Sequence, residues 1–186
     1  RDLRALYTRT GDGHIVAAGI PWYVTVFGRD SLIASHQLLS INASPARETL
    51  TFLARHQGAQ VDDWRDEQPG KILHEIRRGE LAGAGIVPHS PYFGSVDSTP
   101  WFLILYGQHL RWTGDVAFAE ELLPAAEAAL AWIDEVRAQR QEHDEQDQGR
   151  PEQDEPIPEE RAEGVTHSGS AGPRTRRSGP RRGSTA

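Results

Sequence analysis

The 186-residue chain contains no cysteine and no methionine, and its only lysine is Lys71. The absence of cysteine excludes a disulfide scaffold, a cysteine-based zinc site and a thiol nucleophile, and it is typical of a reducing compartment, so we expect a cytoplasmic protein. No run approaches the roughly 18 apolar residues that a membrane-spanning helix needs, which predicts no membrane partner. Because even an initiator methionine is absent, we expect a fragment or a processed product.

Aromatic residues are absent from the last part of the chain. Every Trp, Tyr and Phe lies at or before Trp132, whereas residues 139–163 contain ten acidic residues and residues 174–182 contain five arginines and no acid. Such a composition cannot bury enough apolar surface to offset about 1–2 kcal/mol of backbone entropy per residue. We therefore predict a disordered charged tail over residues 137–186. The arginine-rich end is interpreted as solvated, with a tether to nucleic acid or membrane and an artefactual reading frame as alternatives.

The part before the tail is mildly acidic, with 11 basic and 17 acidic residues through Glu135, which gives no electrostatic reason for a nucleic-acid partner. Residues 1–28 are predicted to form an extended N-terminal segment and an entrance loop. Asp12-Gly13 is a tight-turn signal between two short apolar-containing runs, which predicts a β-hairpin. Residues 29–136 are predicted to form the folded helical domain.

Helix signals recur through this domain. Apolar spacing predicts helices that begin at Asp30, at Ser44-Pro45 and at Ser98-Thr99-Pro100, the last ending near Thr113-Gly114. A short helix is predicted over residues 71–78. Asp115 is predicted to cap a helix that ends at residues 122–123, and Pro124 to start a separate one. The short connections favour antiparallel helix pairs.

Aromatic and charged residues alternate in the non-periodic segments. Such mixtures suit sugars, because aromatic rings cover the C–H faces while carboxylates and guanidinium groups bind the hydroxyls. Single residues of these segments also have a simpler structural interpretation. Asp30 and Asp97 are typical of helix N-caps, Trp22 and Trp64 are typical of core residues, and the isolated His89 is typical of a hydrogen-bonded structural histidine. The dipeptide His74-Glu75 lacks the second histidine of a zinc-protease helix, and no dinucleotide fingerprint or P-loop occurs, so no metal or organic cofactor is expected.

Several ordered motifs resemble one enzyme family. They are Ala18-Gly-Ile-Pro-Trp-Tyr23, Phe27-Gly-Arg-Asp-Ser31, Asp63-Trp-Arg-Asp-Glu67, Pro69-Gly-Lys-Ile-Leu-His-Glu75, Tyr92-Phe-Gly-Ser-Val-Asp97 and Arg111-Trp-Thr-Gly-Asp115. In this order they resemble the catalytic domain of bacterial amylo-α-1,6-glucosidase-like proteins, relatives of glycogen debranching enzymes in the six-hairpin glycosidase superfamily. The resemblance covers about residues 2–135.

The resemblance implies an all-α fold, an incomplete (α/α)₆ toroid of antiparallel helix pairs in which residues 29–136 form a partial six-hairpin glycosidase domain. It implies hydrolysis of α-glucosidic, α-1,6, linkages of glycogen-like α-glucans by inversion, with a carboxylic acid and a carboxylate base about 6.5–9.5 Å apart. In the family the acid lies on a later Gly-Trp segment followed by Asp, which has no counterpart here. The catalytic pair is therefore expected outside this chain, and the chain alone is predicted inactive.

By residue, the resemblance implies that Asp30 accepts hydrogen bonds from the hydroxyls of a terminal glucose and that Arg29 donates to them. The full set of implied substrate-binding residues is Trp22, Phe27, Arg29, Asp30, Trp64, Arg65, Asp66, Glu67, Glu75, Tyr92 and Asp97. The expected partner is an α-glucan or oligosaccharide, and the oligomeric state is left open. The alternative is a non-catalytic carbohydrate-binding or helical interaction fragment, whose exposed apolar faces would favour association.

Overall fold

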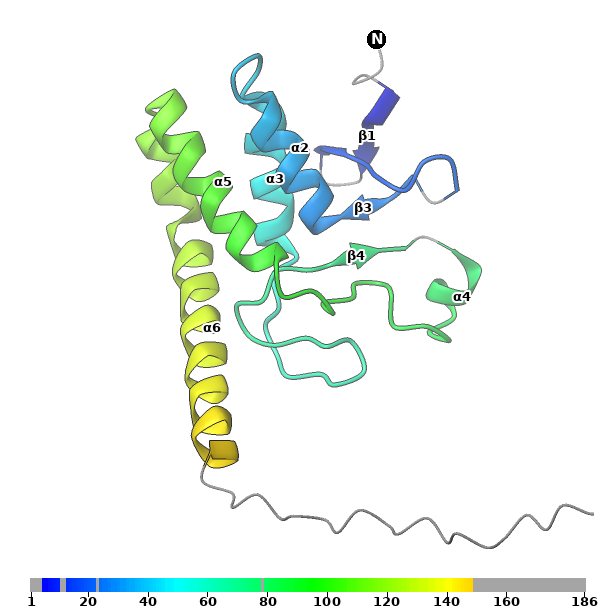
Figure 1. Ribbon diagram of the computed structural model, residues 1–186. Helices are drawn as coiled ribbons and strands as arrows, with labels where there is room; N and C mark the ends of the chain where they lie inside the picture. Colours follow the sequence, from blue (N-terminus) through cyan, green and yellow to red (C-terminus); the bar gives the residue numbers. More distant parts are fainter. Residues whose placement is uncertain (1–4, 11–12, 23, 78, 149–186) are drawn as a thin grey trace, which may run out of the picture. The chain divides into compact units, whose positions relative to one another are not determined.

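The computed structural model describes residues 5–10, 13–22, 24–77 and 79–148, with side chains as far as residue 145. Within these residues the chain is mostly helical and has a few short strands, which confirms the expected helical class. Four helices, α2 (Gly28–Leu38), α3 (Ser44–Arg55), α5 (Ser98–Thr113) and α6 (Val116–Gln148), pack against one another, and the strands and the short helix α4 (Glu80–Gly83) lie to one side of them (Figure 1).

The predicted N-terminal hairpin is confirmed. Strand β1 (Tyr7–Thr10) pairs antiparallel with β2 (Gly13–Val16), and Tyr7 stands opposite Val16. The fully buried Ile15 joins the core from this hairpin, and the backbone N–H of His14 donates to the Glu48 carboxylate on α3 at 3.1 Å. The hairpin therefore covers one end of the first helix pair.

Helix α2 (Gly28–Leu38) begins earlier than the sequence predicts. Phe27 is its N-cap, so Asp30 lies in the first turn, and the N-cap interpretation of Asp30 was wrong. The reason is a contact with a distant segment: the N–H of Gly28 donates to the His74 carbonyl at 2.7 Å. A Cβ on residue 28 would lie 2.1 Å from the Leu73 carbonyl oxygen, so only glycine allows this approach.

Helix α3 (Ser44–Arg55) begins one residue before the Ser-Pro pair predicts, because Ala43 and not Ser44 is its N-cap, and the proline lies in its first turn. The predicted helix over residues 71–78 is wrong as far as the structure describes that segment. Strand β4 (Glu75–Ile76) pairs antiparallel with β3 (Val26–Phe27), and α4 (Glu80–Gly83) follows. The segment is extended because Ile72 and Leu73 are both fully buried and its backbone hydrogen bonds reach other segments. The N–H of Ile72, for example, donates to the Thr99 hydroxyl oxygen at 2.9 Å.

Helix α5 (Ser98–Thr113) ends as predicted at Gly114, which adopts a left-handed φ of 67°. The predicted cap at Asp115 is also confirmed, since its carboxylate accepts from the Phe118 N–H at 3.1 Å. The predicted break at Pro124 is wrong, because α6 (Val116–Gln148) continues through it. Buried Phe118, Leu122, Ala126, Ala129 and Trp132 keep one apolar stripe on both sides of the proline.

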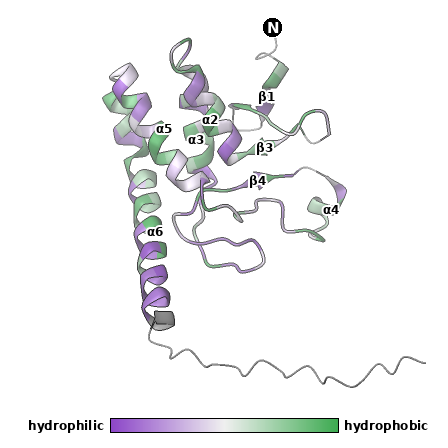
Figure 2. Cartoon of the chain, in the orientation of Figure 1, coloured by the Kyte–Doolittle hydropathy of each residue, from purple (hydrophilic) through white to green (hydrophobic). Residues whose placement is uncertain are grey.

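The far end of α6 also corrects the predicted tail. Residues 137–148 are helical, and the remainder of the predicted disordered segment lies outside the described residues. This end of the helix is hydrophilic (Figure 2) and is rich in Gln, Glu and Arg, which have high helix propensity. Local propensity therefore extends the helix without a buried face.

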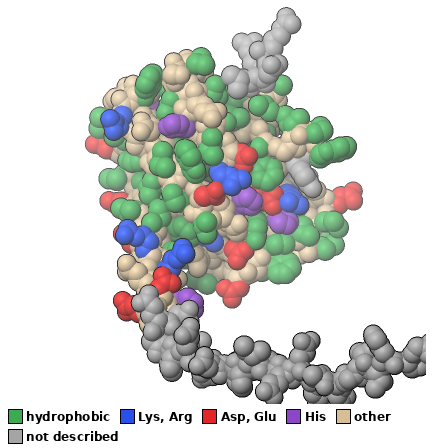
Figure 3. Space-filling model, viewed as in Figure 1, with side chains coloured by type: hydrophobic (Ala, Val, Ile, Leu, Met, Phe, Trp, Pro, Cys, Tyr) green, Lys and Arg blue, Asp and Glu red, His purple; other side chains and the backbone are tan. Residues whose placement is uncertain are grey.

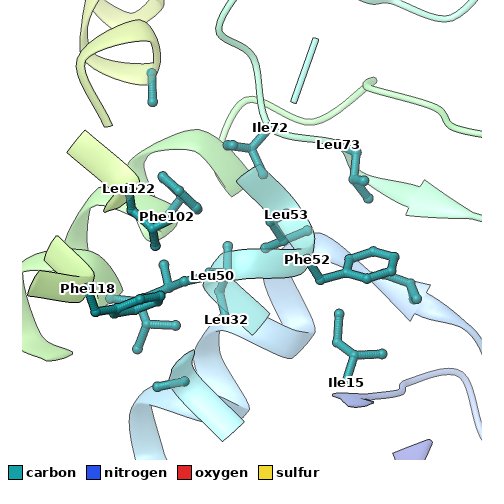
Figure 4. Close-up of a cluster of buried hydrophobic side chains, with 14 of the residues drawn as sticks. Ile15, Leu32, Leu50, Phe52, Leu53, Ile72, Leu73, Phe102, Phe118 and Leu122 are labelled. Atoms are coloured by element: carbon teal, nitrogen blue, oxygen red, sulfur yellow. The ribbon is translucent and has the colours of Figure 1, made fainter. Parts of the chain in front are cut away.

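A single cluster of buried apolar side chains joins the helices to the β2, β3 and β4 segments (Figure 4). Its fully buried members come from β2, from the helices α2, α3, α5 and α6, from the segment before β4 and from the segment of Phe93, and Phe118 and Leu122 of α6 belong to the same cluster. The largest are Ile15, Leu32, Leu50, Leu53, Ile72, Leu73, Phe93, Phe102 and Leu105. Because residues 72, 73 and 93 belong to irregular segments, the core also holds the loops that carry polar residues.

Candidate functional site

A buried carboxylate lies where β4 faces the start of α2. Glu75 is 2% exposed and pairs across the ribbon with Phe27. Its Oε2 atom accepts from the Arg77 Nε at 2.9 Å, and the Nδ1 atom of His89 lies 2.7 Å from its Oε1 atom, an ion-pair distance without hydrogen-bond alignment. A buried carboxylate needs such partners, because burial without them carries a large desolvation penalty.

Aromatic rings surround this carboxylate. The ring of Tyr92 meets those of His74 and His89 edge to face, with centroids 6.2 and 5.0 Å apart, and His74 meets Phe27 in the same way at 6.0 Å. A hydrogen bond with the Asp66 carboxylate, together with burial, raises the pKa of Tyr92 above its usual range. Gly94 makes room for this ring, since a Cβ there would lie 2.2 Å from the Tyr92 hydroxyl oxygen.

The ion pair between Arg29 and Asp97 joins the starts of α2 and α5. The Arg29 Nη1 atom donates to Asp97 Oδ2 at 3.0 Å, and the side chains are 48% and 42% exposed. Asp97 occupies the N-cap position, as the sequence predicts, but its carboxylate makes no capping bond and accepts instead from Arg29 and from Ser95 Oγ at 2.5 Å. Burial raises the pKa of Asp97, but the bonds from Ser95 and Arg29 outweigh it and hold that pKa below its usual range.

The loop of residues 62–67 lies beside the Tyr92 segment. The Phe93 N–H donates to the Arg65 carbonyl at 2.8 Å, which brings Arg65 and Asp66 next to the aromatic rings. Glu67 is buried and accepts from the Ala59 N–H at 3.0 Å, so its role is to shape the loop. Trp64 is 60% exposed.

The chain's lysine supports the same loop from inside. The buried Lys71 donates from Nζ to the Asp66 carbonyl at 2.8 Å and lies 5.6 Å from the ring centre of Trp132 on α6. Burial lowers its pKa. The loop that carries Asp66 is therefore anchored to α6.

Two sets of contacting side chains, linked by the backbone bond from the Gly28 N–H to the His74 carbonyl, form what we call the polar cluster. One set is Arg29, Ser95 and Asp97, and the other is Asp66, His74, Glu75, Arg77, His89 and Tyr92. Figure 3 shows acidic, basic and histidine side chains gathered on this face, bordered by apolar ones. Five members of the cluster were predicted site residues: Arg29, Asp66, Glu75, Tyr92 and Asp97. Two other predicted residues, Phe27 and Arg65, adjoin the cluster. Four members, His74, Arg77, His89 and Ser95, were not among the predicted site residues. The alternation Glu75-Ile76-Arg77 was the available signal, because a two-residue period indicates a strand.

Two predicted residues lie at separate hollows. Trp22 is 86% exposed and lines a hollow of about 410 Å³ with Thr25, Arg77 and α4. Asp30 lines another, of about 360 Å³, together with Ile33 and the segment that follows β2. The eleven predicted residues therefore do not form one pocket.

No protein-family model and no curated protein matches this chain. Among the described residues, no group of three or more His, Cys, Asp or Glu side chains is placed to hold a metal ion. None of the helices in the described ranges combines the length and apolar character needed to cross a bilayer.

Proposed function

We propose that the chain is the substrate-recognition part of a glycoside hydrolase that acts on α-glucosidic, α-1,6, linkages of glycogen-like α-glucans. In this proposal its helices belong to an incomplete (α/α)₆ toroid and the polar cluster faces the sugar. The chain contributes sugar-binding residues, whereas the general acid and base of the inverting reaction are not among its residues. The motif resemblance supports the family, and the polar cluster supports the sugar-binding role.

The half-exposed pair of Arg29 and Asp97 is the observation that carries the proposal. A guanidinium group has five N–H donors, and Arg29 uses one of them toward Asp97. The remaining donors and the solvent-facing carboxylate edge suit vicinal hydroxyls, which donate and accept at neighbouring positions. Because the pKa of Asp97 is low, its carboxylate is ionised at neutral pH and acts as an acceptor.

The aromatic rings of the cluster supply the other half of sugar recognition. Phe27 precedes Arg29 by two residues at the start of α2, and Tyr92 lies across β4 from it. Aromatic faces shield the C–H surface of a pyranose from water while the charged pair orients its hydroxyls. Glu75 serves to position Arg77 and His89, because all but 2% of its surface is buried.

Calorimetric titration with isomaltose, maltose and β-linked cellobiose tests the recognition role. We expect the α-linked sugars to bind and Arg29→Ala to weaken them about tenfold or more, the value of one lost charge-assisted hydrogen bond. The matched control is Arg47→Ala, because Arg47 forms an equally exposed ion pair with Asp115 at a different place. Equal affinity in the wild type and the Arg29 variant would refute the role of this pair.

Glucose release tests the catalytic half of the proposal. The chain alone is expected to release no glucose from glycogen or isomaltose over long incubations. Steady turnover by the purified chain, abolished by one carboxylate substitution within it, would show that the acid and base lie in this sequence. The proposal that the general acid and base are not among the residues of this chain would then be wrong.

A helical interaction fragment is the second candidate. It is favoured by exposed apolar side chains on α5 and α6, namely Ile104, Trp112, Leu123 and Leu130. Such a fragment would bind no sugar and would associate through these side chains. Light scattering of the wild type against Trp112→Ser and Leu123→Ser, combined with the titrations, separates the two functions.

A further inference from the structure

The chain buries its only lysine and uses it to hold one backbone carbonyl. Lys71 is 8% exposed, and its Nζ atom donates to the carbonyl oxygen of Asp66 at 2.8 Å. The ring centre of Trp132 lies 5.6 Å from the same atom. A neutral carbonyl and a ring face offset only part of the desolvation penalty of a buried cation. An apolar side chain of similar length would avoid that penalty, so stability alone does not account for a lysine here.

Asp66 is the residue whose orientation this bond fixes. It lies in the tight loop of residues 62–67, whose two end residues exchange backbone hydrogen bonds of 3.0 Å, and it has a left-handed φ of 52°. Few residues other than glycine adopt this backbone conformation, although aspartate does so more readily than most. The Asp66 carboxylate in turn accepts the hydrogen bond that raises the pKa of Tyr92. The bond from Lys71 therefore stabilises the backbone conformation in which this carboxylate meets Tyr92.

The segment that carries Lys71 is itself held against helix α6. A Cβ on residue 70 would lie 2.2 Å from the Ala128 carbonyl oxygen, so the backbone at Gly70 lies directly against the helix. The Trp132 Nε1 atom also donates to the side-chain oxygen of Gln68 at 2.6 Å. The ammonium group of Lys71 thus reaches the loop from a rigid support, as a residue that orients a binding group requires.

We propose that Lys71 is a positioning residue of the sugar site, which acts through the Asp66 carboxylate to hold the Tyr92 side chain in its binding orientation. The inference rests on the proposed function, which places a sugar ring against Tyr92. The backbone beside Tyr92 is held separately, by the bond from the Phe93 N–H to the Arg65 carbonyl at 2.8 Å. A ring that is already oriented binds a sugar more tightly, because less side-chain freedom is lost on binding.

Lys71→Met tests this role, because it keeps the length of the side chain and removes the ammonium group. Calorimetry is expected to show a loss of about fivefold in isomaltose affinity, the value of one ordinary hydrogen bond. The urea midpoint of unfolding is expected to equal or exceed that of the wild type, since the desolvation penalty of the cation disappears. A lysine with a purely structural role would give the opposite pair of results, a lower midpoint and an unchanged affinity.

Thr49→Val is the matched control. It removes one partner of another buried hydrogen bond, in which the Oγ atoms of Ser35 and Thr49 lie 2.9 Å apart between α2 and α3. This variant is expected to leave the isomaltose affinity unchanged. An equal loss of affinity in the Thr49 and Lys71 variants would assign the effect to general loosening of the fold and would overturn the positioning role.

A double-mutant cycle tests whether Lys71 acts through Asp66. Asp66→Gly removes the carboxylate, and glycine suits the left-handed φ at this position. Its loss of isomaltose affinity should equal or exceed that of Lys71→Met, and combining the two substitutions should lower the affinity no further than Asp66→Gly alone. Additive losses would show that Lys71 does not act through this carboxylate.

The absence of cysteine from the chain permits a chemical rescue. Lys71→Cys, alkylated in urea with 2-bromoethylamine and then refolded, regains an ammonium group at the same distance from the backbone. Alkylation with 1-bromopropane gives a neutral side chain of the same shape. The first product is expected to recover the wild-type isomaltose affinity and the second to match Lys71→Met, whereas equal affinities of the two products would overturn the role of the ammonium group.

The outcomes separate this inference from the proposed function. If the wild type binds isomaltose and Arg29→Ala weakens the binding while Lys71→Met does not, the positioning role is overturned and the proposed function stands. If the wild type binds no α-linked sugar, both the proposed function and the role of Lys71 in it are wrong.

Discussion

Replacing Gly28 with alanine is expected to destabilise the fold and the polar cluster together. The new Cβ would lie 2.1 Å from the Leu73 carbonyl oxygen, where ordinary contact begins at 3.4 Å, so the two segments must separate by about 1.3 Å. That movement breaks the bond from the Gly28 N–H to the His74 carbonyl, now 2.7 Å long. Overpacking costs about 1–3 kcal/mol and a lost hydrogen bond about 1 kcal/mol, which predicts a loss of about 2–4 kcal/mol.

The assay is urea unfolding followed by circular dichroism, with Gly107→Ala as the matched control. Gly107 lies inside α5 and has open space at its Cβ position, so alanine there is expected to stabilise the chain by about 0.5–1 kcal/mol. The two Gly-to-Ala changes should therefore have opposite signs. Equal or higher stability of the Gly28 variant would refute the close approach between α2 and the segment before β4.

Two further predictions concern α6 and its junction with α5. Pro124→Ala is expected to raise the free energy of unfolding by about 1–3 kcal/mol, because proline inside a continuous helix leaves the Glu120 carbonyl without a donor. An unchanged or lower thermal unfolding temperature of this variant would contradict a single continuous helix. Burial lowers the pKa of His109 from 6.5, so the unfolded chain takes up a proton below pH 6.5 that the folded chain does not. Stability should fall as the pH decreases below 6.5, and urea unfolding of His109→Gln should show a weaker decrease; identical pH dependence in both proteins would contradict the burial effect.

Local signals in the sequence predicted the elements whose causes are local. The hairpin signal before Gly13, the cap at Asp115 and the stop at Gly114 each act within a few residues, and the structure confirms the pairing of β1 with β2, the cap and the stop. The segment before Glu75 was predicted to be helical because Ile72, Leu73 and Ile76 suit one helix face. Its strand instead depends on Val26, 50 residues earlier, which no local pattern reveals.

The polar cluster was predictable to the extent that its residues lie in unusual segments. Arg29, Glu75, Tyr92 and Asp97 stood out because charge and aromatics alternate around them, and they lie in one region of the fold. The partners of Glu75 could not be predicted in the same way. His89 lies next to Glu75 because Tyr92, three residues after His89, pairs with residue 75, and no local pattern indicates that pairing. Asp30 was misassigned as a cap because the Gly28 contact begins the helix two residues earlier.

The long sequence separations within the polar cluster have a consequence for the order of folding. Arg29 and Asp97 are 68 residues apart, whereas α5 and α6 are joined by a short turn at Gly114. Contacts that close long loops form late, because chain entropy opposes them until other contacts exist. We expect the α5–α6 hairpin to form early and the cluster last. A bound sugar would then stabilise a step after the folding barrier, and it would slow unfolding without accelerating folding.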